Sequence, residues 1–487
     1  MERRTKIVAT LGPATDDPKV LDKLIEAGVD VVRLNFSHGT AEDHMRRAET
    51  VRNRARAHGR QVGVLADLQG PKIRIDRFKD GVVELEEGAK FILDANWPSD
   101  AGTEERVGLT YKDLPKDVKR ADLLLLDDGR IELWVDEVKG SEIHCKVKVG
   151  GKLSNNKGIN RQGGGLSAPA LTEKDKEDIK TAAGLKADYL AVSFPRCADD
   201  MRQARRLLRE AGGQGGLMAK IERSEALEVI DEIIDASDAV MIARGDLGVE
   251  IGDAALPPVQ KDIIKKSRTM NRVVITATQM MESMIESQIP TRAEVFDVAN
   301  SVFDGTDAVM LSAETAAGKY PDKAVAAMDR ICRVAEKQQV TKRSDHRINT
   351  RFERVDEAIA MATMYAANHL EVKAIAALTE SGATPLWMSR ISSGIPIYAL
   401  TGHVSTRRKV TLYRGVYPIS FDSTSRDHAT VNREAVDELK RRGVVRDGDL
   451  VIITKGDLMG VMGGTNAMKI LRVGEEAPPN NVCETQD

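Results

Sequence analysis

The chain has 487 residues, of which 41% are hydrophobic and 30% charged, which is enough for about three domains of usual size. Its formal net charge of −3 excludes bulk attraction to nucleic acid or to an anionic membrane surface. No apolar run approaches the roughly 18 residues of a membrane span. We also expect no targeting segment, because the first residues lack a signal-peptide core. The cysteines lack disulfide or metal spacing, so we expect reduced thiols in a cytoplasmic protein; they are Cys145, Cys197, Cys332 and Cys483.

Eight short apolar runs predict a parallel sheet. Continuous Val, Ile, Leu and Ala residues are typical of strands buried on both faces, and amphipathic segments such as Asp17 to Ala27 lie between the runs. Eight strand–helix units predict a (β/α)8 TIM barrel, with a doubly wound open sheet as the alternative. The runs begin near Lys6, Val29, Val62, Asp188, Leu217, Ala239, Val273 and Ala308.

A long interval after the third run predicts an inserted domain over residues 71–167. Alternating stretches there, with turn dipeptides Asp80-Gly81 and Asp128-Gly129, predict an all-β lid with hairpins at the catalytic end of the barrel. A domain in that position can close over a site and exclude water.

The pattern restarts beyond residue 342, where we expect a helix over 355–370 and strands over 372–378, 396–400 and 450–454. The predicted organisation is therefore a barrel from residues 1–70 and 168–342, a lid from 71–167, and a C-terminal α/β domain from 343–487.

Two of the predicted barrel strands each end on a carboxylate beside a cation. Alternation along a strand places Lys220 and Glu222 on one face, and Arg244 and Asp246 likewise. Two carboxylates at neighbouring strand ends suit a hard divalent cation such as Mg²⁺, and a lysine beside it would oppose negative charge on a phosphate or an enolate. Ordinary strand-end salt bridges are the alternative.

Further polar side chains follow the other strands, and many of them are cationic. Arginine and lysine residues around an acidic pair suit phosphoryl transfer. The chain has neither a P-loop nor a protein-kinase glycine-rich loop, so those two routes to a nucleotide are excluded. These strand-end residues include Arg33, Asn35, Ser37, His38, Asp67, Lys72, Arg74 and Thr278.

Several long motifs, taken together and in order, resemble the pyruvate kinase family over nearly the whole chain. They are RLNFSHG at 33–39, AKIE at 219–222, ARGDLGVE at 243–250, ATQMMESM at 277–284, PTRAE at 290–294 and LSAETA at 311–316. The resemblance is to the bacterial type, and within it to the subtype activated by AMP or sugar monophosphates. It implies a barrel, a lid after the third strand and a C-terminal effector domain, usually assembled as a homotetramer. The implied reaction transfers the phosphoryl group of phosphoenolpyruvate to ADP, giving pyruvate and ATP.

The same resemblance implies roles for individual residues. Glu222 and Asp246 are the implied ligands of a protein-bound Mg²⁺; a second Mg²⁺ arrives with ADP, and Mn²⁺ can substitute. Arg33 is the implied phosphate clamp, and Lys220 is the implied cation that faces the phosphoryl group and then the enolate. The backbone of Arg244, Gly245 and Asp246 is implied to hold the substrate carboxylate, and Thr278 to take part in proton delivery. The implied nucleotide contacts are His38, Arg74 and Lys157.

One residue departs from the family pattern. Most members have an acidic residue in the motif GPxIR and need K⁺, whereas this chain has Lys72 at that position. An ammonium about 5 Å from a K⁺ would repel it by roughly 3 kcal/mol at an effective dielectric of about 20. We therefore expect Lys72 to replace K⁺; the alternative is that Lys72 points to solvent and a cation still binds. The monovalent site would otherwise consist of Asn35, Ser37, Asp67 and the carbonyl of Leu68.

In the C-terminal domain, a polar turn before a predicted helix resembles the family's effector phosphate site. Its residues are Thr379, Glu380, Ser381, Gly382, Ala383 and Thr384. Ala383 and the following Pro385 make the turn atypical for the family. The resemblance to the bacterial subtype implies AMP or a sugar monophosphate rather than a sugar bisphosphate. A plain capped helix is the alternative. For the whole chain, the rival functions are a Mg²⁺-dependent enolate-forming lyase or aldolase and a non-catalytic metabolite sensor.

Overall fold

The computed structural model describes residues 2–342, 351–422, 428–457 and 462–475, so Cys483 lies outside the described residues. The chain forms two compact units, one of residues 7–331 and one of residues 1–6 with 332–487. Among the helices that the structure describes, none has both the length and the apolar character needed to cross a lipid bilayer. The predicted domain boundaries stay a prediction.

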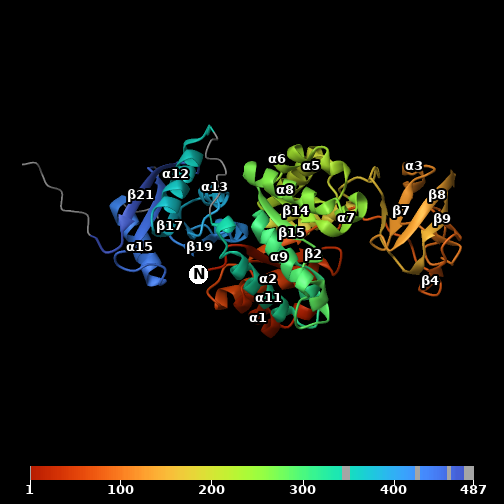
Figure 1. Cartoon of the computed structure of the whole chain (residues 1–487), viewed down its shortest axis with the longest axis horizontal. Coiled ribbons are helices and arrows are strands. Elements are labelled where there is room, and N and C mark those ends of the chain that lie inside the picture. Colours follow the sequence, from red (N-terminus) through yellow and green to blue (C-terminus); the bar gives the residue numbers. More distant parts are fainter. Residues whose placement is uncertain (1, 343–350, 423–427, 458–461, 476–487) are drawn as a thin grey trace, which may run out of the picture. The chain divides into compact units, whose positions relative to one another are not determined.

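The first unit contains a closed barrel of eight parallel strands, as predicted. The strands follow one another around the barrel in the order β1-β16-β15-β14-β13-β12-β3-β2, and nearly all their residues are buried. Figure 1 shows helices such as α5, α8 and α9 around the strands. The strands are β1 (Lys6–Leu11), β2 (Val31–Asn35), β3 (Gly63–Asp67), β12 (Tyr189–Val192), β13 (Gly216–Ile221), β14 (Ala239–Ala243), β15 (Val273–Ala277) and β16 (Ala308–Leu311).

Several barrel helices, such as α1 and α2, begin at polar caps that the sequence provides. The Asp17 side chain accepts from the backbone N–H of Lys19, and Thr40 and Asp43 form a capping box. The helices are α1 (Pro18–Ala27), α2 (Ala41–Ala57), α4 (Glu173–Gly184), α5 (Ala198–Glu210), α6 (Ile230–Asp235), α7 (Arg244–Ile251), α8 (Leu256–Thr269), α9 (Arg292–Asp304), α10 (Ala313–Ala316) and α11 (Pro321–Ala335). Short 3₁₀ segments are η1 (Pro13–Thr15), η2 (Glu225–Leu227), η3 (Glu282–Ile285), η4 (Gln339–Thr341) and η5 (Val410–Leu412).

Strand register brings the polar ends of the strands to one level. Asn35 pairs with Asp67 across β2 and β3, and Ala243 pairs with Ala277 across β14 and β15. The residues that follow these strands therefore converge at the carboxyl end of the barrel.

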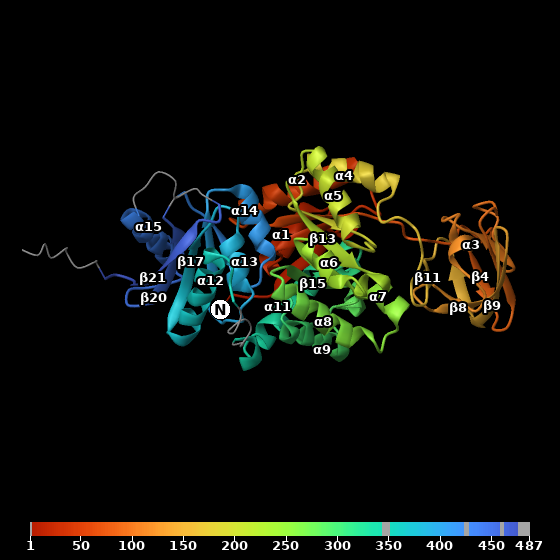
Figure 2. The ribbon, with the colours of Figure 1, turned by 90° about the horizontal axis from the view of Figure 1, so that it is seen from above.

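The insert forms a six-stranded sheet in the order β11-β7-β8-β9-β5-β6 and a two-stranded sheet, β10-β4, around one apolar core. Asp128-Gly129 joins β7 to β8 in the predicted hairpin. The hairpin predicted at Asp80-Gly81 is wrong, because β4, which follows it, pairs with the distant β10. Figure 2 shows β11 beside α7 of the barrel. The elements are β4 (Val82–Leu85), β5 (Lys90–Asp94), β6 (Arg106–Gly108), α3 (Leu114–Asp117), β7 (Leu123–Leu126), β8 (Ile131–Lys139), β9 (Glu142–Val149), β10 (Gly151–Ser154) and β11 (Ile159–Arg161).

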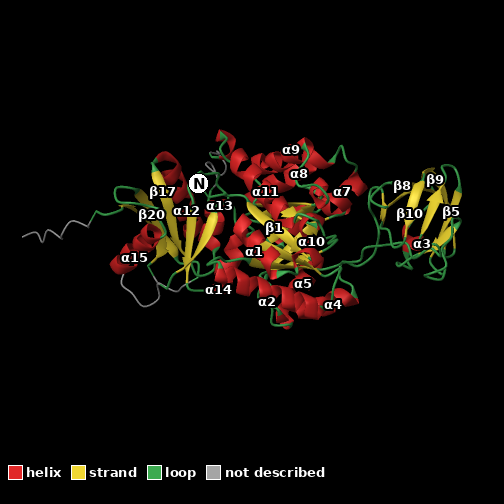
Figure 3. Ribbon diagram, turned by 90° about the horizontal axis from the view of Figure 1, so that it is seen from below, coloured by secondary structure: helices red, strands yellow, loops and turns green. Residues whose placement is uncertain are grey.

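The second unit is an α/β domain with a five-stranded sheet, β19-β18-β17-β20-β21, in which only β21 is antiparallel to its neighbour. Helix α15 packs on one face through Val431, Ala435 and Leu439, and Figure 3 shows helices flanking the strands. The elements are α12 (Val355–His369), β17 (Val372–Leu378), α13 (Ala383–Ser389), β18 (Ile397–Thr401), α14 (Val404–Lys409), β19 (Val416–Ser420), α15 (His428–Arg441), β20 (Leu450–Gly456) and β21 (Thr465–Arg472).

Candidate active site

A cavity of about 690 Å³ opens at the carboxyl end of the barrel. Barrel residues Asp246 and Thr278 and lid residues Leu125 and Glu132 all line it, so the insert covers the end where the predicted site residues converge. A volume of this size is typical of a small-molecule site.

Lys220 is the buried centre of the site. Its Nζ lies 3.0 Å from Oε1 of Glu222 and 3.4 Å from Oδ1 of Asp67, and it donates a 2.6 Å hydrogen bond to Oγ of Ser193. Burial alone would lower the pKa of Lys220, but Asp67 and Glu222 outweigh it and raise that pKa above its ordinary value. The ammonium is therefore held charged inside the barrel.

Glu222 is oriented by two groups. Its Oε1 faces Lys220, and its Oε2 accepts a 2.9 Å hydrogen bond from the backbone N–H of Phe194. Burial raises the pKa of the Glu222 carboxyl; Lys220 opposes this rise and the negative charge of Asp246 adds to it. Because the charge of Asp246 acts on the Glu222 carboxyl, the two predicted metal ligands belong to one electrostatic site.

Arg33 and Asp67 form an ion pair at the ends of β2 and β3. Nε of Arg33 lies 2.6 Å from Oδ2 of Asp67, and Nη1 donates to Oγ1 of Thr10 at 3.1 Å. Because Asp67 also faces Lys220, this one carboxylate fixes the two cations predicted to face the substrate.

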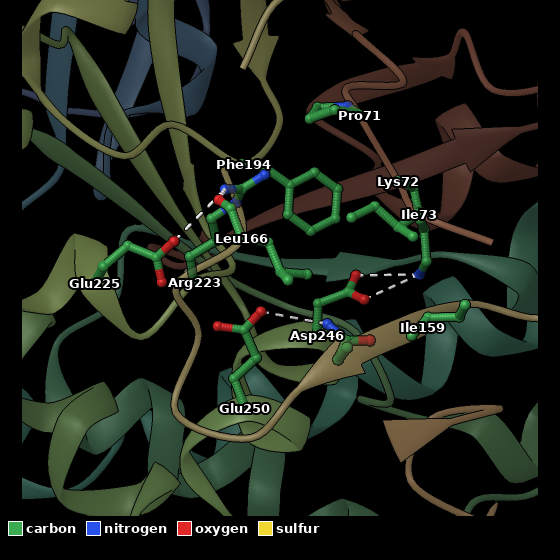
Figure 4. Close-up of a pocket in the computed structure, with 11 residues that line it drawn as sticks. Pro71, Lys72, Ile73, Ile159, Leu166, Phe194, Arg223, Glu225, Asp246 and Glu250 are labelled. Carbon is green, nitrogen blue, oxygen red and sulfur yellow. Dashed lines mark hydrogen bonds and ion pairs between the residues drawn. The ribbon is translucent and has the colours of Figure 1, made fainter. Parts of the chain in front are cut away.

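Lys72 contacts Asp246 rather than pointing to solvent. Its Nζ lies 3.0 Å from Oδ1 and 3.3 Å from Oδ2, and Figure 4 shows the ammonium facing both oxygens. The other predicted monovalent-site groups have partners of their own. Leu68 O accepts from Ser193 Oγ at 2.8 Å, and Asn35 Oδ1 accepts from the backbone N–H of Ser37 at 3.1 Å.

The start of α7 is tied to the end of β15. Nη2 of Arg244 donates to the Thr278 carbonyl at 2.8 Å, and the Gly245 N–H donates to Thr278 Oγ1 at 2.8 Å. Thr278 has a φ of 67°, a left-handed conformation that a β-branched residue rarely adopts. The guanidinium of Arg244 also pairs with Asp297 of α9 at 2.7 Å, so its side chain ties this loop to that helix.

The three predicted nucleotide contacts lie apart from the buried cluster. Lys157 pairs with Asp127 inside the lid at 2.7 Å, and Nη1 of Arg74 donates to the Asn156 carbonyl at 2.9 Å. His38 is exposed after β2, and its backbone N–H donates to the Asn35 carbonyl. Lys157 and Arg74 therefore move with the insert, whereas His38 belongs to the barrel.

Sequence reasoning missed Ser193, Phe194 and Glu250. Ser193 links Lys220 to the Leu68 carbonyl, and Phe194 holds Glu222 from a backbone with a φ of 54°. Glu250 accepts from the backbone N–H of Ser224 at 2.8 Å and from Nδ2 of Asn160 at 3.4 Å. The polar Ser-Phe-Pro ending of the fourth predicted strand was the available signal for the first two.

The predicted effector turn follows β17 and leads into α13. Gly382 has a φ of 82°, and its N–H donates to Oγ1 of Thr379 at 2.9 Å. Glu380 pairs with His403 at 2.6 Å, and Thr384 shares a 2.8 Å hydrogen bond with Thr465. The turn is thus braced by its own side chains, with Ser381 Oγ accepting from Ala383 N–H at 3.4 Å.

Among the described residues, no group of three or more His, Cys, Asp or Glu side chains is arranged to hold a metal ion. Two carboxylates suit Mg²⁺ nonetheless, since this ion usually binds one or two protein carboxylates and completes its shell with water and substrate oxygens. Glu222 and Asp246 are hard oxygen donors in one site, so they fit that ion.

The fold and the site define a barrel enzyme that gathers carboxylates, lysines and an arginine at the carboxyl end of the barrel, where the barrel and the insert also line one cavity. Comparison with known proteins identifies the family. A family model described as pyruvate kinase, barrel domain, matches residues 2–325, and one described as pyruvate kinase, alpha/beta domain, matches residues 357–471. The chain belongs to the pyruvate kinase family, which confirms the predicted fold, family and phosphotransferase class.

Named relatives agree with the family models over nearly the whole chain. Pyruvate kinase II of Salmonella typhimurium is 58% identical over 475 residues, covering 97% of this chain and 99% of the relative. Pyruvate kinase of Haemophilus influenzae is 54% identical over 487 residues, covering 99% and 98%. Pyruvate kinase of Staphylococcus aureus is 42% identical over 480 residues, covering 97% and 81%.

Proposed function

We propose that the chain transfers the phosphoryl group of phosphoenolpyruvate to ADP, giving pyruvate and ATP. The observation that carries this proposal is the buried ammonium of Lys220 between Asp67 and Glu222, inside a barrel of this family. A fixed positive charge in a water-poor site stabilises negative charge that develops during the reaction.

Glu222 and Asp246 are the proposed ligands of one Mg²⁺; a second Mg²⁺ accompanies ADP, and Mn²⁺ substitutes. When bound, the ion withdraws charge from the phosphoryl and carboxylate oxygens of the substrate. Phe194 and Lys220 hold the Glu222 carboxylate in place through the 2.9 and 3.0 Å contacts described above. The protein thereby fixes the direction of its oxygen donors before substrate arrives.

Lys220 and Arg33 act on the moving phosphoryl group. The bond from the enol oxygen to phosphorus breaks, a bond from phosphorus to a terminal oxygen of ADP forms, and the electron pair stays on the enolate. Lys220 faces that enolate, and the backbone around Gly245 and Asp246 at the start of α7 is the proposed site of the substrate carboxylate, which would take over the Gly245 N–H from Thr278 Oγ1. Thr278, whose Oγ1 accepts from the Gly245 N–H, is the residue proposed to deliver a proton to the enolate carbon.

Arg74 and Lys157 from the lid and His38 from the barrel are the proposed contacts of the nucleotide. Arg74 and Lys157 lie on the insert and His38 lies on the barrel. The proposed nucleotide site is therefore complete only when the insert approaches the barrel. Lys72 is the proposed replacement for K⁺, so turnover does not require that ion; rates with K⁺ excluded and restored test this.

Three further proposals rest on the family resemblance. They are activation by a phosphorylated effector such as AMP or a sugar monophosphate at residues 379–384, a homotetramer, and a cytoplasmic location. Binding of these effectors to the turn and the mass of the assembled protein are the measurements that test the first two.

Lys220→Met and Glu222→Gln test the proposed chemistry. Removing the central ammonium should lower kcat about 10²–10³-fold, as for loss of one preorganised charge stabiliser. Glu222→Gln should raise the Mg²⁺ concentration for half-maximal rate at least about tenfold. The readout is simultaneous pyruvate and ATP formation from phosphoenolpyruvate, ADP and Mg²⁺.

Lys180→Met and Glu177→Gln are matched controls, since these residues form an exposed 2.7 Å pair on α4. They should leave kcat unchanged. Wild-type kcat in Lys220→Met would contradict the proposal. Pyruvate formed without ATP would favour the lyase, and ligand binding without turnover would favour the sensor.

A further inference from the structure

Lys72 lies at the root of the lid and yet reaches a proposed metal ligand on the barrel. Both Asp246 oxygens lie within 3.3 Å of its Nζ, and the two side chains are partly exposed, at 26% for Lys72 and 16% for Asp246. Figure 4 shows the ammonium approaching the carboxylate from the lid-root segment that also carries Pro71 and Ile73.

The other cations of the site are committed elsewhere. Lys220 pairs with Glu222 and Asp67, Arg33 pairs with Asp67, and the Arg244 guanidinium pairs with Asp297. Within the described part of the chain, the ion pair found for Asp246 is therefore the one with Lys72.

An ammonium facing both oxygens takes one acceptor position on each and puts a positive charge beside the place where a divalent cation would bind. Two cationic centres on one carboxylate repel each other, so Lys72 and a divalent cation compete for Asp246. We propose that Lys72 is an exchangeable counter-ion of Asp246, which leaves the carboxylate when a divalent cation binds there. This inference rests on the metal site of the proposed function. It gives Lys72 two positions, one paired with Asp246 before the metal binds and one in which it replaces K⁺.

The exchange is mechanically connected to the lid. Ile159 N donates to Ile73 O at 2.9 Å, and Ile75 N donates to Lys157 O at 2.9 Å, so the outgoing and returning segments of the insert are bonded together next to Lys72. A Cβ at Gly158 would lie 3.2 Å from Lys72 Cε, which places the lysine stem against the returning segment.

Release of Lys72 from Asp246 removes a bond between this paired root and helix α7. Metal binding is thereby coupled to freedom of the lid root. The same ammonium that neutralises Asp246 in the metal-free protein becomes available to face the substrate phosphate once the lid can close.

Direct Mn²⁺ binding without substrates tests the exchange. Free Mn²⁺ is counted from its electron paramagnetic resonance signal in titrations of the full-length wild type, Lys72→Met and Lys112→Met. Removing the competing ammonium should tighten Mn²⁺ binding about 1.5- to fivefold, the range expected for a partly exposed ion pair. Lys112, exposed on the insert 3.8 Å from Asp76, loses the same charge and should leave the affinity unchanged.

Glu222→Gln in each background separates this inference from the proposed function. If Glu222→Gln weakens Mn²⁺ binding but Lys72→Met has the wild-type affinity, the exchange is wrong and the metal site stands. If Glu222→Gln has no effect, the metal site is wrong and the exchange falls with it.

Hydrogen exchange at residues 157–161 gives an independent readout of the lid root. Mn²⁺ should speed exchange there in the wild type, and Lys72→Met should show the faster rate without metal. The four samples are the wild type and Lys72→Met, each with and without Mn²⁺. Equal exchange rates in all four would overturn the coupling between metal binding and the lid root.

Discussion

Glu250 lies on α7, the helix that carries Asp246, and its buried carboxylate joins that helix to the loop after β13 and to the lid. It accepts from Ser224 N–H at 2.8 Å and from Asn160 Nδ2 at 3.4 Å. Burial raises the pKa of Glu250 to about 7, against the lowering effect of the Ser224 hydrogen bond. In the unfolded chain this carboxyl titrates near the ordinary glutamate value of about 4.3.

The raised pKa means that the native state holds the proton more tightly than the unfolded state. The stability from this proton is complete below about pH 4 and is lost as pH rises to about 7. Glu250→Gln, which mimics the protonated group, should therefore gain about 1–3 kcal/mol relative to wild type between pH 5 and pH 8. Urea unfolding of wild type and Glu250→Gln at pH 5 and at pH 8 measures this difference in the free energy of unfolding. Glu177→Gln, at an exposed position, is the control. Equal pH dependence in wild type and Glu250→Gln would contradict it.

At the residue scale, the sequence predicted the groups whose chemistry is visible one strand at a time. Lys220, Glu222 and Asp246 stand at strand ends next to other charges, which is a local signal. Ser193 gives only the polar Ser-Phe-Pro ending as a local signal, because its role appears once the neighbouring strands β12 and β13 bring its hydroxyl to Lys220. The pairing of Lys72 with Asp246 was also unpredictable, since it joins residues on different bodies.

The junction between β3 and the lid depends on Gly70. This residue has a φ of 68°, and a Cβ there would lie 2.6 Å from the Cβ of Ser193. Gly70→Ala therefore combines left-handed strain with a clash and should cost about 2–4 kcal/mol of stability. Because Ser193 holds Lys220, kcat should also fall about tenfold. Denaturant unfolding and initial rates measure the two effects.

Gly81 separates strain from clash. Its φ is 80°, and a Cβ there would meet nothing within 4 Å. Gly81→Ala should cost only the strain of about 1–2 kcal/mol and leave kcat unchanged. The assignment of Gly70 to the site would be contradicted if the two variants had the same kcat.

At the element scale, the barrel strands were predictable because each is an unbroken apolar run buried on both faces. Two strands of the C-terminal sheet were missed for physical reasons. β19 is an edge strand interrupted by Pro418, and β21 pairs along one side only and carries exposed polar residues such as Lys469. The three-residue β11 is too short to give any periodic signal.

The N-terminal residues belong to the same unit as the C-terminal domain, and Arg4 fastens them to it. Its guanidinium donates to Thr341 O at 2.7 Å and to Glu336 O at 2.6 Å, and it also contacts the carbonyl of Ser393. Arg4→Ala would leave these carbonyls and the Glu336 carboxylate without their cation. We expect a loss of about 2–4 kcal/mol in the C-terminal unit.

Native-state hydrogen exchange of β17 amides measures that loss without assuming that the whole chain unfolds at once. Arg441→Ala is the matched control, because that arginine is exposed in the same unit and pairs with Glu438 on its own helix. Unchanged exchange of β17 in Arg4→Ala would show that the N-terminal residues do not stabilise this unit.

The most direct measurement on the whole molecule is the stoichiometry of pyruvate and ATP formed from phosphoenolpyruvate, ADP and Mg²⁺. It is made in tetramethylammonium buffer with K⁺ and NH₄⁺ excluded, and repeated with K⁺ restored. We expect one ATP for each pyruvate and the same rate in both buffers, because Lys72 supplies the positive charge. Turnover only with K⁺ would contradict the role of Lys72, and absence of ATP in both buffers would contradict the proposed reaction.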